Sequence, residues 1–232
     1  YEMSASLVGS EMCIRDRHWT MVDLLTKDNC CYGVVVRKDD GSLDTITANY
    51  TVLACGGIGG IYRYSTNYRH LTGDGIAVAI KHGVELKNVN YVQIHPTTFY
   101  SEKEEDRSFL ISESVRGEGA RLYDKNMNRF VDELLPRDLL TQEIYKQMEK
   151  DGTDFVWEDL RTIPRDELIS HFPNIIEHCS QAGYDVFHEC IPIVPAQHYF
   201  MGGIKVNHNS KTSMDHLYLS LIHISEPTRL AL

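Results

Sequence analysis

The sequence is 232 residues long, is 42% hydrophobic and carries a formal net charge of -10 at pH 7. This excess of acid gives no attraction to nucleic acid or to anionic lipid, so the composition argues against a protein that binds either through a basic surface. No apolar run approaches the roughly 20 residues that span a bilayer, which predicts no direct membrane insertion. The length suits one domain or two small ones.

The two ends of the chain contain a related pair of peptides. Residues 6–17, SLVGSEMCIRDR, and residues 219–230, LSLIHISEPTRL, are translations of opposite strands of one oligonucleotide. Selection on a protein does not produce such a pair, and the oligonucleotide resembles a transposase-based sequencing adapter. The first segment also lacks the basic start, apolar stretch and cleavage site of a signal peptide. We therefore expect residues 1–17 and 219–232 to be adapter-derived and residues 18–218 to be a fragment of a longer protein.

Cysteine and histidine usage gives no sign of a metal centre or a disulfide framework. Outside the adapter-like segments the cysteines are Cys30, Cys31, Cys55, Cys179 and Cys190. Their number is odd and they contain no CxxC pair, which is typical of reduced thiols in a cytoplasmic protein. The histidines are scattered without metal-ligand spacing. We expect a cytoplasmic protein with no bound metal.

The first part of the genuine sequence has the pattern of an α/β domain. Residues 32–37 and 44–48 are β-prone and flank the turn sequence KDDGS, which predicts a hairpin. Residues 50–55 form a short apolar run, typical of a strand buried on both faces. A glycine turn and the start of a helix are expected directly after this run.

Beyond this turn the pattern continues with a helix and then changes. An Ala- and Ile-rich helix is expected over 76–82, followed by a strand at 84–86. Between 89 and 199 short strands and helices alternate irregularly. The elements expected there and just beyond are a strand at 110–111, helices at 112–117, 137–150, 165–172 and 174–182, and a strand at 204–206. This texture predicts an α/β domain interrupted by an α+β insertion.

The glycines after the predicted strand have two explanations. Because glycine lacks a Cβ atom, the backbone at Gly56 and Gly57 could approach a ligand closely, and a following helix N-terminus favours a phosphate. Many strand-to-helix turns contain two glycines for packing alone, and the residues by themselves favour that explanation. Asp74, between two glycines, is either an N-cap for the next helix or a carboxylate aimed at a ribose hydroxyl.

Basic side chains in four separate blocks suggest an anion site. His95 lies in IHPTT, Arg116 in SESVRGEG, Arg137 in LPRD and His198 in IVPAQHY. Arg forks and imidazoles can hold the two carboxylates of a small diacid. Taken singly, a histidine beside proline is usually a turn residue, and an arginine at a helix start is usually solvated or paired. The SESVRGEG block begins within one helical turn, so Ser112 and Arg116 are expected to share a face.

A series of sequence blocks resembles, in the same order, the succinate dehydrogenase, fumarate reductase and L-aspartate oxidase flavoprotein family. The blocks are VLACGGIGGIYRYSTN, TGDGIAVAIKHGVEL, VQIHPTTFY, LISESVRGEGARL, LPRDLL, HFPNIIEHC, IPIVPAQHYFMGGI and KTSMDHLY. One block would be suggestive, whereas the ordered series over 18–218 is highly specific.

The resemblance implies an FAD-binding domain of Rossmann type with an inserted α+β capping domain. By resemblance, residues 18–88 and 200–218 belong to the FAD-binding domain and residues 89–199 to the capping domain. FAD is then the expected cofactor. The residues that match family FAD contacts are Ala54, Gly56, Gly57, Asn67 and Asp74.

The same resemblance implies roles for the basic blocks. Arg137 matches the family arginine that transfers the proton paired with hydride transfer, and Glu113 and Arg116 match relay and support positions beside it. Because an arginine normally keeps its charge, that role requires a water-poor site with a relay. The residues that match substrate carboxylate contacts are His95, Ser112 and His198, with Ser112 in place of a threonine.

Within the family, the IPIVPAQHY and HFPNIIEHC blocks and the proline before Arg137 favour a member that oxidises L-aspartate to iminoaspartate, a precursor of the NAD ring. FAD would accept the hydride, and oxygen or fumarate would reoxidise it. A fumarate reductase or succinate dehydrogenase flavoprotein subunit is the alternative, since a serine commonly precedes that arginine there. A non-catalytic relative should have lost part of the cationic set, which is complete here. The fragment alone is expected to be inactive, because the N-terminal GxGxxG turn lies outside it.

Overall fold

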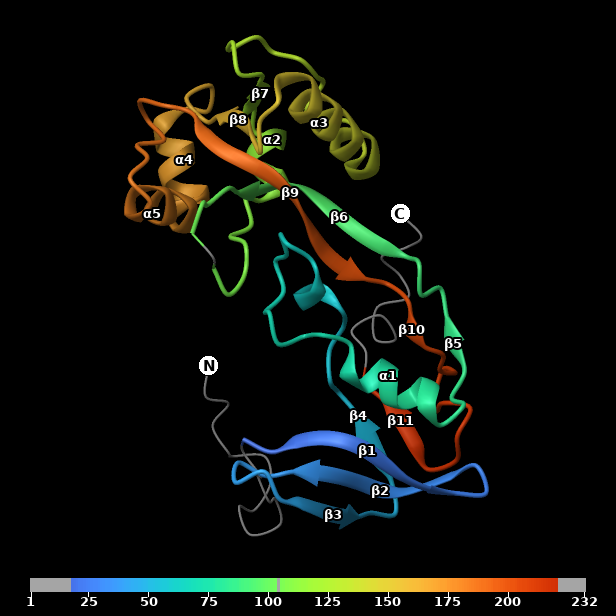
Figure 1. Cartoon of the computed structure of the whole chain (residues 1–232). Coiled ribbons are helices and arrows are strands. Elements are labelled where there is room, and N and C mark those ends of the chain that lie inside the picture. The colour runs from blue at the N-terminus through green and yellow to red at the C-terminus, as the bar shows by residue number, and fades with distance from the viewer. Residues whose placement is uncertain (1–17, 104, 221–232) are drawn as a thin grey trace. The chain divides into compact units, whose positions relative to one another are not determined.

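The computed structural model describes residues 18–103 and 105–220 of a mixed α/β protein, which divides into two compact units (Figure 1). The first unit comprises the chain up to residue 54, residues 74–86 and the chain from residue 204 onward. The second comprises residues 55–73 and 87–203. Most of the segments expected to be adapter-derived lie outside the described residues.

The first unit contains a three-stranded antiparallel sheet of order β1-β2-β3. Its elements are β1 (Thr20–Lys27), β2 (Cys30–Arg37), β3 (Leu43–Thr47), β4 (Thr51–Leu53), α1 (Asp74–Lys81) and β11 (Leu217–Leu219). The predicted hairpin is confirmed as the antiparallel pair β2 and β3. A second hairpin joins β1 to β2 through Asp28 and Asn29, whose φ angles of 50° and 58° suit a two-residue turn that matches the strand twist.

The strand that the sequence predicts to be buried on both faces is buried on one face only. β4 pairs in parallel with β11, which places Leu219 opposite Leu53. Leu53 is buried, but Val52 is 60% exposed. Among the described residues β4 has a single strand neighbour, so no sheet forms there to bury the second face. The pairing of Leu219 uses backbone groups that any sequence supplies, so it does not bear on the origin of that residue.

The predicted helix of the first unit is confirmed as α1. Asp74 opens the helix, where an acidic side chain is favourable at the helix N-terminus. The prediction of a strand at 84–86 is wrong in its position. The N–H of Val84 donates to the carbonyl of Ala79 in the last turn of α1, so this residue completes the helix end. The strand β5 begins only at Leu86.

The second unit is built on a four-stranded antiparallel sheet of order β6-β9-β8-β7. Its elements are the 3₁₀ helix η1 (Gly59–Ile61), β6 (Val92–Phe99), α2 (Glu113–Gly117), β7 (Arg121–Tyr123), α3 (Arg137–Asp151), β8 (Val156–Asp159), α4 (Arg165–His171), α5 (Pro173–Gln181) and β9 (Ile191–Phe200). The short strands β5 (Leu86–Lys87) and β10 (Gly203–Ile204) pair with each other. β9 therefore lies between the edge strand β6 and β8.

The core of the second unit fixes where α3 begins. The helix packs against β6 and β8. Leu140 and Ile144, one turn apart on α3, are fully buried in a cluster with Leu122, Ile191 and Ile193. Burial of this face holds the start of α3 close to β6.

The four helices predicted between 89 and 199 are confirmed, and their ends follow the local signals. Pro136 precedes α3, and Gly152 follows it with a φ of 66°, in the left-handed region that favours glycine. Pro173 occupies the first turn of α5. The short strand expected before α2 is reduced to one bridge between Leu110 and Thr98.

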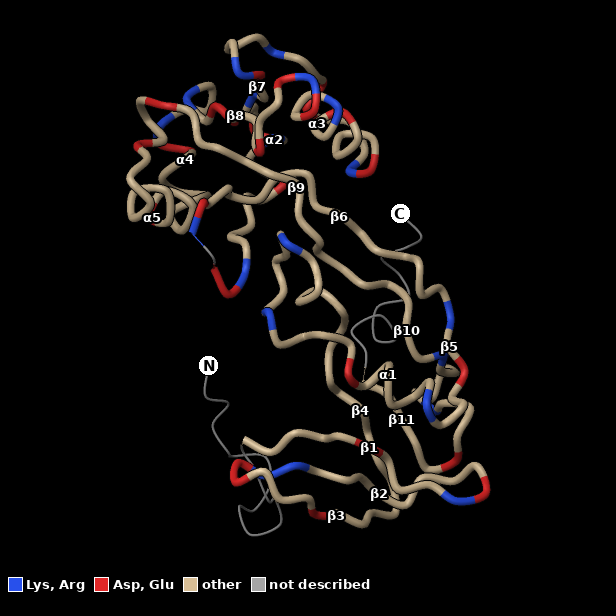
Figure 2. The backbone as a smooth tube through the Cα atoms, in the orientation of Figure 1, with Lys and Arg blue, Asp and Glu red and all other residues tan. Residues whose placement is uncertain are grey.

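Acidic and basic side chains are interleaved along α3 and the loop before it (Figure 2). On the helix, Lys146 donates to Glu143 at 2.7 Å across one turn. The helix carries four acidic and three basic side chains, so it offers no basic stripe for nucleic acid. In the portion of the chain that the structure describes, no helix has both the length and the apolar content needed to cross a bilayer.

Replacing Ile144 by Ala removes a fully buried side chain and leaves a cavity between α3 and the sheet. We expect the free energy of unfolding to fall by about 2–5 kcal/mol. Urea denaturation followed by circular dichroism measures this loss. Gln142→Ala, at an exposed position of the same helix, should change the free energy by less than about 0.5 kcal/mol. Equal effects of the two substitutions would contradict the assigned core.

Candidate active site in the second unit

The pairing of β6 with β9 brings two predicted substrate residues together. Two successive residues of β6 pair with Gln197 and Tyr199, which leaves His198 between them as the extra residue of a β-bulge. A bulge bends the strand and re-aims a side chain. The ring centroids of His95 and His198 lie 5.3 Å apart with an interplanar angle of 67°, an edge-to-face arrangement.

His95 is buried on β6 and only 1% exposed. Its Nδ1 atom lies 3.0 Å from the carbonyl oxygen of Thr97 and 3.2 Å from the backbone nitrogen of the same residue. Burial, and after it the charges of His198, Arg137 and Arg116, lowers the pKa of His95 to about 3. His95 is therefore a neutral imidazole at neutral pH and would act on an anion through hydrogen bonding rather than charge.

His198 is held by the loop that follows η1. The Nδ1 atom of its ring lies 2.7 Å from the Thr66 hydroxyl. The Asn67 amide donates to the backbone oxygen of His198 at 2.8 Å and to Gln197 Oε1 at 2.9 Å. Burial, followed by the charge of Arg137, lowers the pKa of His198. The loop thus fixes both the bulge and the orientation of a second neutral ring.

Arg137 opens α3 and connects three elements. Its Nε atom donates to Glu113 Oε2 at 2.8 Å, its Nη2 atom bonds the same oxygen, and its Nη1 atom donates to Gln93 Oε1 at 3.0 Å. The hydrogen bond from Arg137 lowers the pKa of Glu113, so this carboxylate is ionised at neutral pH. The Arg137 side chain is 33% exposed among the described residues.

Arg116 lies in α2 and points into the core. It is 3% exposed, its Nη1 atom donates to the carbonyl oxygen of Glu133 at 2.7 Å, and its Nη2 atom is 3.9 Å from Glu113 Oε1. The expectation that Ser112 shares a helical face with Arg116 is wrong. Ser112 is the N-cap, with extended backbone, and its hydroxyl accepts from the N–H of Ser114 at 3.3 Å. The one-turn relation does not apply to a residue outside the helix.

The predicted FAD contacts fall in both units. Gly56, Gly57 and Asn67 belong to the second, and Ala54 and Asp74 to the first. Gly56 is exposed and has a φ of 75°, a conformation that favours glycine. Exposed backbone in this conformation fits a cofactor bound through its phosphates, but a Cβ atom added at Gly56 would also meet the side chain of Leu71, so the same glycine allows close packing.

Gly59 and Gly60, the next two glycines after Gly57, serve packing. A Cβ atom at Gly60 would collide with the carbonyl oxygen of Arg69, and the Gly60 N–H donates to the Leu71 carbonyl at 2.9 Å. A Cβ atom at Gly59 would collide with the side chain of Asn67. The helix expected after the glycine turn is only the short η1.

Two residues of the cluster are absent from the sequence-based set. Gln93 binds Arg137 and lies two positions before His95 on β6. Alternation along a strand could have indicated that these two side chains share a face. Thr66, the partner of His198, lies far away in the sequence, and no local pattern marks it.

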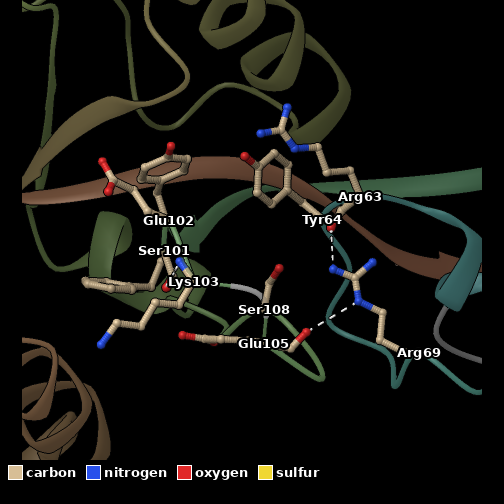
Figure 3. Close-up of a pocket in the computed structure, with 10 residues that line it drawn as sticks. Arg63, Tyr64, Arg69, Ser101, Glu102, Lys103, Glu105 and Ser108 are labelled. Atoms are coloured by element: carbon tan, nitrogen blue, oxygen red, sulfur yellow. Dashed lines mark hydrogen bonds between the residues drawn. The ribbon is translucent and has the colours of Figure 1, made fainter.

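A separate pocket of about 340 Å³ in the second unit is lined by residues outside the predicted substrate set (Figure 3). Arg69 extends along it and donates to the backbone carbonyls of Tyr62 at 2.9 Å, Arg63 at 3.0 Å and Glu105 at 3.4 Å. Its guanidinium therefore holds two loops together. Within the described ranges no group of three or more His, Cys, Asp or Glu side chains could hold a metal.

The cluster of His95, Glu113, Arg116, Arg137 and His198 combines two guanidinium groups, one carboxylate and two neutral imidazoles. Guanidinium groups attract anions and bind carboxylates with two parallel hydrogen bonds. Neutral imidazoles add directed donors without repelling these cations. The arrangement is suited to a small molecule with more than one carboxylate.

Comparison with known proteins agrees with this chemistry. Residues 6–218 match the family described as FAD binding domain. The chain therefore belongs to the FAD binding domain family.

Two curated relatives show which kind of protein in this family the chain is similar to. The chain is 50% identical to an L-aspartate oxidase of Clostridium perfringens over 198 residues, which are 85% of this chain and 45% of the relative. It is 47% identical to an L-aspartate oxidase of Clostridium acetobutylicum over 196 residues, which are 84% of this chain and 45% of the relative. The chain thus spans a little under half the length of these curated relatives.

A solved structure of a quinol-fumarate reductase with menaquinol molecules is also similar. The TM-score is 0.76 and the sequence identity 33%, over 87% of this chain and 38% of that one.

The low pKa of His95 predicts that its imidazole does not titrate between pH 5 and pH 8. Nuclear magnetic resonance of the histidine side chains, with the signal assigned through His95→Gln, should show neutral-ring shifts throughout this range. The ordinary pKa of 6.5 applies to the unfolded chain, which therefore binds a proton between pH 6.5 and about 3 that the folded state does not. Stability from this group is lost as the pH falls through that window. A midpoint near 6.5 for the assigned signal would contradict the buried, neutral assignment.

Proposed function

We propose that the complete protein is an FAD-dependent L-aspartate oxidase, which converts L-aspartate to iminoaspartate for NAD biosynthesis. The observation that carries the proposal is the convergence of Arg137, Glu113, Arg116, His95 and His198 in one unit from four different elements. The identity of 50% with the Clostridium perfringens enzyme supports the choice of substrate. We place the reaction in the cytoplasm, with oxygen or fumarate as the acceptor that reoxidises the flavin.

The two units fit parts of this enzyme. The first unit corresponds to part of a Rossmann-type FAD-binding domain, and residues 89–199 correspond to the inserted capping domain. Residues 55–73, expected with the FAD-binding domain, cluster by contacts with the second unit. The residues that would hold FAD are Ala54, Gly56, Gly57, Asn67 and Asp74. Bound FAD would supply the acceptor for two electrons and a proton.

We assign the first contribution to substrate binding to the positive charges of two arginines. Arg137 and Arg116 provide two fixed cations for the two carboxylates of the substrate, and Glu113 neutralises only part of that charge. Ser112 adds a hydroxyl. Since its oxygen already accepts from the N–H of Ser114, its proton is available to donate to a carboxylate.

The two imidazoles add hydrogen bonds whose direction follows from their partners. When the Thr66 hydroxyl donates to Nδ1 of His198, the other ring nitrogen carries the proton and can donate to a carboxylate. When the Thr97 N–H donates to Nδ1 of His95, the same holds for that ring. An anionic ligand therefore favours these tautomers, and it is held in a fixed orientation.

Oxidation of the aspartate breaks one C–H bond and one N–H bond. The Cα hydrogen would leave with both bonding electrons to the bound cofactor, and the amine proton would leave through Arg137, which would hand a proton on to Glu113 as it receives one. Glu113 bonds Arg137 and is half-exposed, so it can pass the proton to water, while Arg116 holds Glu113 from the other side. Fixed charges that orient the substrate lower the barrier because no reorganisation is needed during the reaction.

Two other functions compete with this one. The 33% identity with quinol-fumarate reductase favours a fumarate reductase or succinate dehydrogenase flavoprotein as the second candidate. The dicarboxylate site would serve that reaction equally, since fumarate and succinate are also four-carbon dicarboxylates. A non-catalytic relative is disfavoured, because the cationic and imidazole groups are all present.

Replacing Arg137 by Leu in the complete protein removes the cation that bonds Glu113 and Gln93. We expect turnover of L-aspartate to fall by at least about 10²–10³-fold, a loss typical of removing one group that acts on the transition state. The visible spectrum of bound flavin should remain. Anaerobic flavin reduction by L-aspartate, followed by stopped flow, measures the effect. Lys150→Leu, at the far end of the same helix, is the matched control, and unchanged reduction in the Arg137 variant would contradict the proposal.

The choice between the two enzyme functions is tested by substrate preference. The complete protein should reduce its flavin at least about 100-fold more efficiently with L-aspartate than with succinate, as judged by kcat/KM. Steady-state assays with both substrates and one electron acceptor provide the comparison. A preference for succinate would assign the protein to the fumarate reductase and succinate dehydrogenase group instead.

A further inference from the structure

Thr66 contacts His198 and has no part in the roles that the family resemblance implies. It lies in the loop between η1 and α1. Among the described residues, its hydroxyl is the one group that hydrogen-bonds the His198 ring, with Oγ1 at 2.7 Å from Nδ1. His198 is a predicted contact for a substrate carboxylate. The group that bonds its ring therefore influences how the ring meets the substrate.

The backbone of this loop is attached directly to the bulge of β9. The N–H of Thr66 donates to the carbonyl of Gln197 at 2.9 Å, and the N–H of Gln197 donates to the carbonyl of Tyr64 at 3.0 Å. Ser65 and Gln197 thereby form a parallel bridge. The distance between the Thr66 hydroxyl and the His198 ring is therefore set by backbone pairing beside both residues, and not only by two side chains.

Buried side chains hold the same loop in place. The Ser65 hydroxyl donates to Gln197 Oε1 at 2.7 Å, and the Asn67 amide donates to the same oxygen at 2.9 Å. Ser65 and Gln197 are 3% and 1% exposed. A Cβ atom at Gly59 would lie 2.5 Å from that oxygen and 2.5 Å from Cβ of Asn67, so η1 packs tightly against this network. The loop has no free space into which the hydroxyl could withdraw.

The direction of the hydroxyl proton follows from the acceptors within its reach. Oγ1 of Thr66 is 3.5 Å from the Gln197 carbonyl oxygen, which already accepts the Thr66 N–H. A hydrogen bond of that length is weak, so donation to Nδ1 of His198 at 2.7 Å is the stronger bond. A neutral ring then carries its proton on Nε2. The His95 ring differs, because its Nδ1 lies close to both the N–H and the carbonyl of Thr97.

We propose that Thr66 is a positioning residue that holds His198 in the tautomer with its proton on Nε2, and so keeps this ring a hydrogen-bond donor to a substrate carboxylate. The inference rests on the proposed function. In the other tautomer Nε2 would present a lone pair to the carboxylate, and two acceptors form no hydrogen bond. Thr66 thus acts on the substrate through the ring, without a contact of its own.

The test compares native protein with Thr66→Val in the complete flavoprotein. Valine retains the branched shape and removes the hydroxyl. The Kd for succinate, followed through the flavin spectrum, should rise about five- to tenfold, because a hydrogen bond to a charged carboxylate is weakened. The KM for L-aspartate should rise by a similar factor, whereas kcat should fall less than about twofold, since the bond forms in the substrate complex as well as in the transition state.

A second measurement reports the tautomer itself. Nuclear magnetic resonance of the histidine ring nitrogens at pH 7, with the signals assigned through His198→Gln, is applied to the ligand-free flavoprotein. Native protein should show His198 protonated on Nε2, and Thr66→Val should show a mixture of the two tautomers. The signals of His95, whose Nδ1 partners are backbone groups, should be the same in both proteins.

Two further variants control for the loss of a hydroxyl. Thr66→Ser retains the hydroxyl and should keep the native tautomer and a Kd within about twofold of native. Thr153→Val is the matched control, because it removes a hydroxyl that donates to the Phe155 carbonyl at 2.9 Å, beyond the end of α3. It should change neither the Kd nor the His198 signals. Should Thr66→Val fail to bind flavin, Thr66→Ala also removes the hydroxyl and serves the same comparison.

The outcomes separate the two proposals. A native Kd in the Val variant, a His198 ring that stays protonated on Nε2 there, or equal losses in the Val and Ser variants would each overturn the role of Thr66 and leave the proposed function intact. Native protein that binds succinate but does not oxidise L-aspartate would overturn the proposed function, while a weaker Val variant would still support the role of Thr66. Native protein that binds neither compound would overturn both.

Discussion

The β-bulge of β9 at His198 is the constraint on which the candidate site depends. Without the extra residue, strand alternation would place His198 on the opposite face from Gln197, and both would keep the register of β6. The extra residue instead leaves Gln197 buried and turns the His198 ring toward His95. Bonds from Thr66 and Asn67 then hold the bulge in place. Backbone irregularity here is stabilised by side chains from one loop, which makes that loop part of the site.

The second organising feature is the distribution of charge around the two rings. Burial and the nearby guanidinium groups both favour neutral imidazoles, so His95 and His198 do not compete with Arg137 and Arg116 for counter-ions. Glu113 is the acid that remains ionised beside them. A ligand with two carboxylates would meet cations from two helices and uncharged donors from two strands. This division explains why all four elements are needed for one small site.

Sequence patterns predicted the helices of the second unit well, because proline and glycine mark their starts and ends. The long strands β6 and β9 were not predicted, and their prolines explain why. Pro96, Pro192 and Pro195 remove backbone donors, which argues against a strand in a sequence. In the structure Pro96 lies at a second irregularity, between His95 and Thr98, where the ladder is already interrupted. The basic residues of the cluster stand out in the sequence as four separate blocks and take their roles from resemblance, whereas Gln93 and Thr66 depend on pairings that only the folded chain creates.

Two buried acids of the second unit show how position decides the state of a carboxylate. Burial raises the pKa of Glu133, but hydrogen bonds from Arg129 and from the Leu122 N–H outweigh that effect and lower it. Arg129 reaches Glu133 from the surface and remains 46% exposed, so little desolvation of the cation opposes the pair. Glu158 is fully buried, and neither of its carboxylate oxygens has a hydrogen-bond partner among the described residues. Glu133 therefore keeps its charge and bonds Arg129 and the Leu122 backbone, whereas burial raises the pKa of Glu158 to about 8. An acid of the second kind costs the core the solvation of its carboxyl group without a compensating hydrogen bond, whereas the bonds to Glu133 offset that cost.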